Sequence, residues 1–263
     1  QLISVNWSKT GAKLEHIEII LCGFINEINF NNSCSGFTIN MMKNLNLVKK
    51  KEADSYFTRN KSVYDKALTN LIDKKISDLI EINSIQVNNI LEIGCANGNN
   101  LNHYSKLCNS KKSYGIDLSR KAILNGKRKY KNLKLLNISS IEIDKITINF
   151  DFIICGFFLY HLDRELIFRQ FDLIHKKLSN NGLLLIWDFD PLFKHSNKDF
   201  NTKELTSFKM SYDSFLIESG LFEIVYKHKY VPQAKNKRKF KSDTRALTLF
   251  RKIDFRKKYP ENI

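Results

Sequence analysis

A glycine-rich bend over residues 90–99 carries the strongest chemical signal in the sequence. The segment reads ILEIGCANGN and places Glu92 near the end of an apolar stretch, just before Gly94 and Gly98. Glycines at these two positions let the backbone turn tightly and approach a ligand without a clash from a Cβ atom. A helix that begins near Asn99 would add free N–H groups facing the same ligand. The pattern predicts a binding turn between a strand and a helix.

A carboxylate follows at the end of the next apolar stretch. Asp117 closes residues 113–117, which read SYGID. A carboxylate at this place can accept hydrogen bonds from both ribose hydroxyls of an adenosine. A nicotinamide cofactor would require G-x-G-x-x-G after the strand, but Ala96 and Asn99 stand at the second and third glycine positions. The turn and the carboxylate therefore predict an adenosyl ligand other than NAD.

These residues resemble the first motifs of the class I S-adenosylmethionine-dependent methyltransferases. Their acidic-x-G-x-G-x-G pattern appears here with Ala96 in place of the middle glycine, and the resemblance extends over about residues 50–253. It implies a Rossmann-like fold and S-adenosylmethionine as the cofactor. It implies that Asp117 binds the ribose, that Leu118 lies against the adenine, and that Asn137 and Ile138 flank the adenine amine. It also implies that the methionine part is held by Glu92, Gly94, Cys95, Ala96, Asn97 and Gly98. The family more often has an acidic residue where Asn137 stands.

A narrower resemblance rests on residues 157–191, 208–212 and the YFTRNK segment at 56–61. These segments are similar to the small methyltransferases of bacterial surface-saccharide gene clusters, such as the pseudaminic-acid-associated methylases. The similarity implies a saccharide or nucleotide-sugar acceptor with a hydroxyl or an amine. Within YFTRNK, Arg59 could pair with the cofactor carboxylate or with an anionic substrate, since a guanidinium binds such groups in a forked geometry. A single arginine at a helix end is more often an ordinary surface residue.

Methyl transfer to a hydroxyl requires a base, and three side chains are candidates. His161 directly follows a predicted strand at the edge where open α/β sheets bind ligands, and a histidine pKa lies near neutrality. The alternative is that His161 caps a helix or packs in a loop. Asp188 and Asp190 end a later strand and are rival bases, each at least as well suited to holding a loop by hydrogen bonds.

Further residues around these candidates complete the predicted site. Gly156 and Phe157, at the end of the strand before His161, are expected to contact the cofactor. The acceptor pocket is expected to include Tyr160, His161, His195, Lys209 and Tyr212. No metal site is predicted.

The elements that must position these residues alternate between strands and helices. Helical periodicity over residues 49–82 precedes apolar strands at 89–94, 113–117, 133–137, 150–158 and 183–189, with helices expected at 99–107, 121–129 and 164–178. A helix at 211–219 and strands at 222–230 and 245–253 follow. The last two strands have no helix between them, so one should run antiparallel. We predict an α/β, Rossmann-like, seven-stranded and mostly parallel sheet with an antiparallel strand in its C-terminal hairpin, and helices on both faces.

The N-terminal residues differ from the rest of the chain. They contain a short apolar stretch at 19–25 and a turn-rich segment at 31–36, before Met41 and Met42. We predict an extension over residues 1–48 and a methyltransferase domain with a helical cap over 49–263. We interpret residues 1–40 as sequence from upstream of the native start, which sequencing of the natural N-terminus would test.

Charge and composition leave three functions open. The formal net charge is +16, from 43 Lys and Arg against 27 Asp and Glu, but the basic residues are spread along the chain. A small-molecule methyltransferase is the first hypothesis. The second is an RNA methyltransferase that uses residues 235–241 and 251–258 to bind phosphates. A methylase of base amines would have an N-P-P-Y-like sequence after the fourth strand, and the sequence GFFLYH at 156–161 argues against that activity. The third is a non-catalytic binding protein that retains the fold.

The cysteines and the apolar segments bear on the compartment. The five cysteines occur singly, without a C-x-x-C pair, which favours free thiols in a reducing cytosol. No apolar run approaches the length of a membrane span. We therefore expect a soluble cytoplasmic protein.

Overall fold

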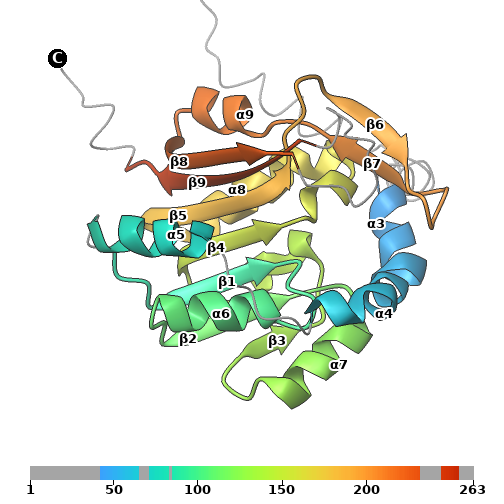
Figure 1. The fold of residues 1–263 in the computed structure, drawn as a ribbon, viewed down its shortest axis with the longest axis horizontal. Coiled ribbons are helices and arrows are strands. Elements are labelled where there is room, and N and C mark those ends of the chain that lie inside the picture. Colours follow the sequence, from blue (N-terminus) through green and yellow to red (C-terminus); the bar gives the residue numbers. More distant parts are fainter. Residues whose placement is uncertain (1–41, 65–70, 83–84, 232–243, 255–263) are drawn as a thin grey trace, which may run out of the picture. The chain divides into compact units, whose positions relative to one another are not determined.

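Seven strands form one sheet in the order β3-β2-β1-β4-β5-β9-β8 (Figure 1). The computed structural model describes residues 42–64, 71–82, 85–231 and 244–254. The sheet strands are β1 (Asn89–Ile93), β2 (Lys112–Ile116), β3 (Lys134–Leu136), β4 (Phe150–Gly156), β5 (Leu178–Phe189), β8 (Phe222–Tyr230) and β9 (Arg245–Lys252). Branched and aromatic side chains dominate β4 and β5, as expected for strands buried on both faces.

The sheet is parallel except at its C-terminal edge. β1 pairs in parallel with β2 and β4, and β4 with β5, whereas β9 runs antiparallel to both β5 and β8. The predicted sheet with its antiparallel C-terminal strand is therefore confirmed. The strand order reverses between β1 and β4, and open α/β sheets bind ligands beyond the carboxyl ends of the strands at such a reversal.

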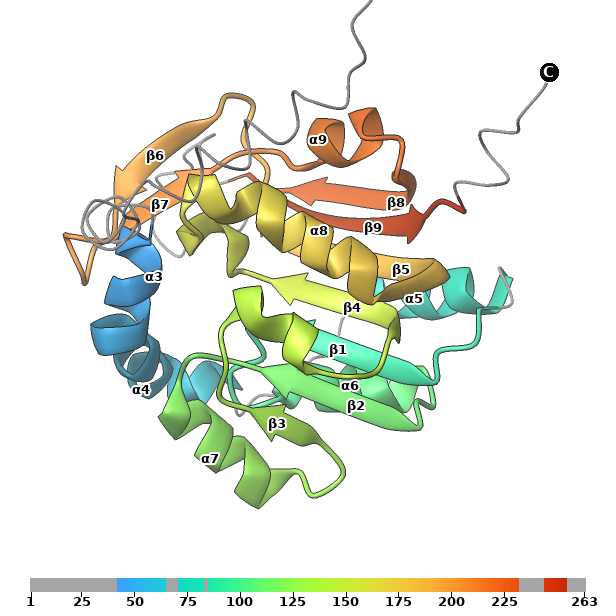
Figure 2. The ribbon, with the colours of Figure 1, turned by 180° about the vertical axis from the view of Figure 1, so that it is seen from behind.

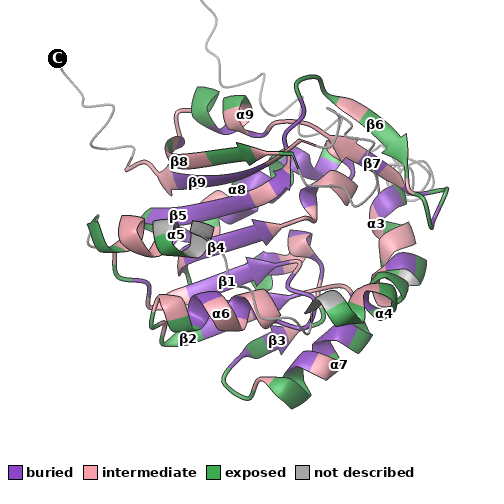
Figure 3. Cartoon of the chain, in the orientation of Figure 1, coloured by how far each residue is buried: buried purple, intermediate pink, exposed green. Residues whose placement is uncertain are grey.

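Helices cover both faces of the sheet (Figures 1 and 2). On one face, α5 (Leu71–Ile82), α6 (Asn99–Leu107) and α7 (Arg120–Lys129) contribute Ile76, Leu101 and Ile123 to a core with β1, β4 and β5. On the other face, α8 (Ile167–Lys177) and α9 (Asp213–Glu218) pack on the same sheet with the 3₁₀ turn η3 (Ser140–Lys145). Figure 3 shows buried strands between helices that expose their outer sides.

The carboxyl edge of the sheet is flanked by two further elements. α3 (Lys43–Leu47), the π-helical turn η2 (Val48–Glu52) and α4 (Ala53–Tyr64) form one continuous helical segment there (Figure 1). A separate hairpin of β6 (His195–Lys198) and β7 (Thr206–Lys209) lies beside α3 (Figure 1). Buried Asn44 joins the two, because its side chain donates hydrogen bonds to the carbonyls of Thr206 (2.7 Å) and His161 (3.1 Å).

Several predicted boundaries differ from the structure. The predicted helix at 164–178 is a 3₁₀ turn, η5 (Arg164–Leu166), followed by α8; a second such turn, η4 (Leu159–His161), precedes it. Residues 180–182, between the predicted helix at 164–178 and the predicted strand at 183–189, lie inside β5 as a bulge, since Leu178 pairs with Phe150 but Leu183 with Phe152. The hairpin of β6 and β7 was not predicted. Residues 1–40 and the basic loop at 235–241 lie outside the described residues.

In the described ranges, no helix has both the length and the apolar composition needed to cross a bilayer.

Candidate functional site

A cavity of about 490 Å³ opens at the carboxyl ends of β1, β2, β4 and β5. This volume is in the range of small-molecule and cofactor sites. The helical segment from α3 to α4 forms the opposite wall. The lining includes Glu52, Tyr56, Gly94, Cys95, Ala96, Asp117, Leu118, Ile138, Gly156, Phe157, Tyr160, His161, Trp187, Phe189 and Arg245.

The turn after β1 has the left-handed backbone that its glycines predict. Gly94 and Gly98 have φ of +76° and +79°, and Ala96 between them has φ of +48°. The amides of Gly94 and Cys95 both donate to the carbonyl of Ile116, at 2.9 and 3.0 Å. The turn is thus fixed to the end of β2, with its Gly94 to Ala96 portion facing the cavity.

Asp117 faces this turn. One carboxylate oxygen accepts the amide of Ala96 (2.8 Å) and the other accepts the amide of Ser119 (2.7 Å). Burial raises the pKa of Asp117, the two amides oppose this change, and the charge of Asp54 adds to it. The structure brings the predicted turn and the predicted carboxylate together at one end of the cavity.

Three residues predicted to hold the methionine part lie outside the lining of this cavity. Glu92 is 1% exposed, and its burial raises its pKa to about 8. Hydrogen bonds from the Asn100 side chain and the Leu101 amide, both in α6, lower the pKa but do not cancel this effect. Asn97 is also buried and donates to Asn125 of α7 (3.2 Å). Gly98 packs beside Leu133 and Leu135. These positions support the turn from behind.

Leu118 and Ile138 were predicted to contact the adenine and to flank its amine, respectively. Both line the main cavity and also a smaller neighbouring cavity of about 240 Å³. Asn137 lines only the smaller one, and its amide donates to the carbonyl of Asp117 (2.8 Å). Asn137 therefore stabilises the end of β2.

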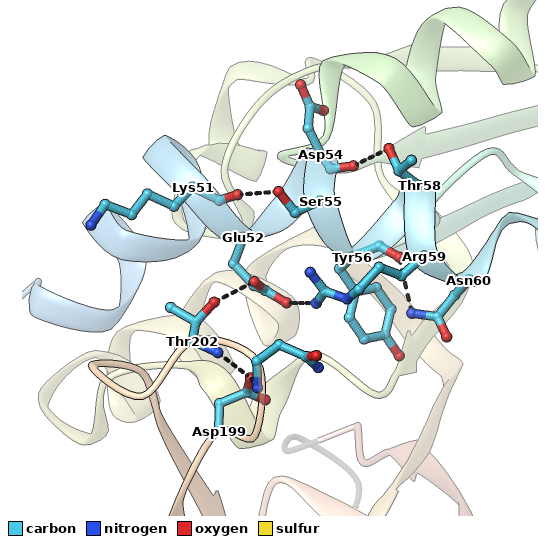
Figure 4. Close-up of polar contacts among 11 residues, drawn as sticks. Lys51, Glu52, Asp54, Ser55, Tyr56, Thr58, Arg59, Asn60, Asp199 and Thr202 are labelled. Atoms are coloured by element: carbon cyan, nitrogen blue, oxygen red, sulfur yellow. Dashed lines mark hydrogen bonds and ion pairs between the residues drawn. The ribbon is translucent and has the colours of Figure 1, made fainter.

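Arg59 is not among the residues that line the cavity. Its guanidinium binds the carboxylate of Glu52, which lies seven residues earlier in the π-helical turn η2 (Figure 4). The other oxygen of Glu52 accepts the hydroxyl of Thr202 (2.5 Å), which lies between β6 and β7. Glu52 itself lines the cavity. The predicted anion-binding arginine is thus already paired with a buried carboxylate.

His161 lines the cavity, but its environment differs from the one expected. Burial lowers its pKa to about 4, and the charges of Asp199 and Glu52 and a hydrogen bond to the backbone of Thr206 only partly oppose this. The imidazole is therefore neutral at pH 7. Its buried Nδ1 has no hydrogen-bond partner in the described part of the chain.

Both rival bases lie outside the lining. Asp188 is 2% exposed, and its burial raises its pKa to about 7. Hydrogen bonds from the amides of Phe189, Tyr160 and Leu159 lower the pKa but only partly offset the burial. Asp188 holds the turn that carries His161. Asp190 forms ion pairs with Lys227 (2.7 Å) and Lys229 (3.3 Å).

Three predicted acceptor residues also lie outside the lining. Tyr212 is buried and its hydroxyl meets the guanidinium of Arg164 (3.3 Å), while His195 is opposite Lys209 in the hairpin of β6 and β7. The Lys209 ammonium lies 4.3 Å from the ring centre of Phe189, behind a residue that lines the cavity.

The sequence reasoning missed an aromatic and cationic end of the cavity. Trp187 and Phe189 come from β5 and Arg245 from the start of β9. The Phe157 ring centre is 5.3 Å from that of Trp187 and 5.9 Å from that of Phe189. The pairing of Phe189 with Arg245 requires the antiparallel register of β5 and β9, which the sequence pattern did not supply.

Residues 91–184, from β1 into β5, match a family model described as a methyltransferase domain. Among curated proteins, uncharacterized protein RP028 of Rickettsia prowazekii is 31% identical over 102 residues, covering 37% of this chain and 41% of that protein. Uncharacterized protein RP789 of the same organism is 32% identical over 131 residues, covering 47% and 24%. The match spans less than half the length of either relative.

Solved structures show the same fold. The 1,6-didemethyltoxoflavin-N1-methyltransferase of Burkholderia thailandensis, bound to 1,6-didemethyltoxoflavin and S-adenosylhomocysteine, has a TM-score of 0.56 at 15% identity, over 76% of this chain and 85% of that one. The N-methyltransferase NodS of Bradyrhizobium japonicum with S-adenosylhomocysteine has a TM-score of 0.50 at 19% identity, over 74% and 97%. Both of these methyltransferases were solved with S-adenosylhomocysteine bound, and their likeness to this chain is one of fold.

Proposed function

We propose that this protein transfers a methyl group from S-adenosylmethionine to a hydroxyl or an amine of a small molecule. The observation that carries the proposal is a single cavity that joins the Asp117 end to the His161 end. A donor bound near Asp117 and an acceptor bound near His161 would share one continuous space, as direct transfer between them requires.

The residues at the Asp117 end fit an adenosyl group. Each carboxylate oxygen of Asp117 accepts one backbone amide and keeps a lone pair for a ribose hydroxyl. Leu118 and Ile138 offer apolar surface for a flat base. A Cβ atom built on Gly156 would meet no atom within 4 Å, so open space lies beside it for the methionine part.

The reaction needs alignment, exclusion of water and, for a hydroxyl acceptor, removal of a proton. When bound, S-adenosylmethionine would supply a methyl group on a sulfonium sulfur, which becomes a neutral thioether as the methyl passes to the acceptor. His161 is neutral at pH 7 and its unpartnered Nδ1, within the described residues, can accept the hydroxyl proton. Asp188 keeps the backbone of Leu159 and Tyr160 in place for this role.

The acceptor that we propose is a saccharide or a nucleotide-sugar. The similarity of residues 157–191 to saccharide-cluster methylases supports this class, and the volume of about 490 Å³ suits a small molecule better than an RNA duplex. The RNA hypothesis depends on residues 235–241 and 251–258, most of which lie outside the described residues. Binding to an RNA oligonucleotide that weakens steeply with salt would favour it over ours.

Calorimetric titration tests the donor. We expect saturable 1:1 binding of S-adenosylmethionine and S-adenosylhomocysteine, and no binding of NAD at the same concentrations. Binding of NAD in place of the two sulfur compounds would contradict the proposal. Tight binding of the donor without turnover on any extract of small molecules would favour the non-catalytic alternative.

A further inference from the structure

An arginine occupies the end of the cavity farthest from Asp117. Arg245 lies at the start of β9, and its guanidinium carbon is 4.9 Å from the ring centre of Phe157 and 5.5 Å from that of Phe189. Its strand is four positions from β2 in the sheet order, roughly 19 Å at about 4.8 Å per strand. Asp117 and Arg245 therefore face different parts of any molecules that fill the cavity.

The charge of Arg245 has no acidic partner in the described part of the chain. Its buried Nε makes no hydrogen bond there, and its contacts are the faces of the two aromatic rings. Arg245 is only partly exposed and lines the cavity. Such a cation is costly to desolvate unless a ligand supplies its counter-charge.

Three acidic side chains that line the cavity or lie at the end of β5 are committed elsewhere. Asp190 is paired with Lys227 and Lys229, and Glu52 with Arg59 and Thr202. Asp188 binds backbone amides beneath the cavity floor. None of these carboxylates neutralises Arg245, so among the described residues its positive charge is unpaired.

We propose that Arg245, held between Phe157 and Phe189, binds an anionic group of the methyl acceptor, a carboxylate or a phosphate. The inference rests on the proposed methyltransferase function and narrows its substrate class to acidic small molecules. A guanidinium pairs with both groups through two parallel hydrogen bonds. The two rings restrict the side chain before the ligand arrives, which lowers the entropic cost of binding.

Binding of matched sugars to protein saturated with S-adenosylhomocysteine tests this subsite. The probes are glucuronate, glucose 1-phosphate and neutral glucose, measured by saturation-transfer NMR. We expect at least one anionic sugar to bind at least tenfold more tightly than glucose, and the identity of that sugar distinguishes a carboxylate from a phosphate site. Arg245→Gln should remove the preference, and Arg245→Lys should retain part of it. Equal binding of all three sugars to the wild type, or an unchanged preference in Arg245→Gln, would overturn the proposal.

Two controls separate this proposal from its alternatives. Arg251→Gln removes a cation of the same strand that does not line the cavity, and it should leave sugar binding unchanged. The affinity of Arg245→Gln for S-adenosylhomocysteine should stay within about twofold of wild type. A tenfold loss would show that Arg245 holds the cofactor carboxylate and would refute an acceptor subsite. Failure of the wild type to bind S-adenosylhomocysteine would instead remove the proposed function itself.

Discussion

Ala96 has a backbone conformation that its side chain disfavours. Its φ of +48° lies in the left-handed region, at the position where the family motif has a glycine. Ala96→Gly should therefore raise the free energy of unfolding by about 1 kcal/mol, as measured by urea denaturation. Ala122→Gly, in the buried part of α7, is the matched control and should lower it by at least about 1 kcal/mol. A destabilised Ala96→Gly variant would contradict the account of strain.

Glu92 should make the fold less stable as the pH rises. Its native pKa of about 8 lies above the ordinary value of 4.5, so between these values the native state keeps a proton that the unfolded state has lost. The free energy of unfolding therefore falls as the pH rises through this window. Glu92→Gln should show a smaller fall than wild type in urea titrations at pH 5 and pH 8. Glu165→Gln, at an exposed glutamate, should not differ from wild type, and identical slopes for Glu92→Gln would refute the buried proton.

His161 should not titrate in the usual histidine range. Its pKa of about 4 keeps the imidazole neutral from about pH 5.5 upward. In an NMR titration of the histidine Cε1 protons, the signal that disappears in His161→Asn should stay at its neutral position from pH 5.5 to pH 8. A midpoint near 6.5 for that signal would show that the side chain is solvated. It would contradict the burial that lowers the pKa of His161.

Sequence reasoning succeeded for residues that the strand ends position directly. The turn at 94–98 and Asp117 were predicted to meet because parallel strands end at the same edge. The environment of His161 could not be predicted, because Asp199 and Thr206 belong to the unrecognised hairpin region of β6 and β7. Glu52 lies only seven residues before Arg59, in the predicted helical segment, but its contact with Thr202 of that same hairpin region was not predictable. The low pKa of His161 depends on burial by those same elements.

At the scale of elements, the long apolar strands were predictable and the hairpin of β6 and β7 was not. Apolar runs identify β4 and β5 because both of their faces are buried. β6 reads HSNK and is mostly exposed, so neither an apolar run nor alternation marks it. Its place beside α3 is set by individual hydrogen bonds, which leave no periodic pattern in the sequence.

Asn44 is the side chain expected to hold this hairpin on the domain. It donates to the carbonyls of Thr206 and His161 and accepts the Thr206 amide (3.2 Å). Asn44→Ala would leave these buried groups unpaired and should lower the free energy of unfolding by about 2 kcal/mol. Hydrogen exchange measured by mass spectrometry should rise over residues 195–209. Asn197→Ala, at an exposed position of β6, is the control; unchanged exchange in Asn44→Ala would show that other contacts hold the hairpin.

At the scale of the whole molecule, the cavity exists because the strand order reverses between β1 and β4. The crossovers diverge there, and the turn after β1 and the last residue of β4 supply Gly94 and Gly156 to the same space. The segment from α3 to α4 then encloses it from the opposite side. The topology thus gives the cavity the two ends at which we propose a donor and an acceptor, and Arg245 and the aromatic side chains line the second of them.

Two glycines, one beside open space and one in a packed contact, test whether this space binds the cofactor. A Cβ on Gly156 meets nothing within 4 Å, whereas one on Gly126 would lie 2.3 Å from the carbonyl oxygen of Asn97. Gly156→Val should therefore keep the melting temperature of the free protein while filling the cavity, and Gly126→Ala should lower that temperature. At about 100 times its Kd, S-adenosylhomocysteine stabilises a protein by about 2.7 kcal/mol, a rise of roughly 5–10 °C here. Calorimetric scans should show this rise for wild type and not for Gly156→Val. A full rise in Gly156→Val would place the cofactor elsewhere, because its side chain would occupy the space that the methionine part requires.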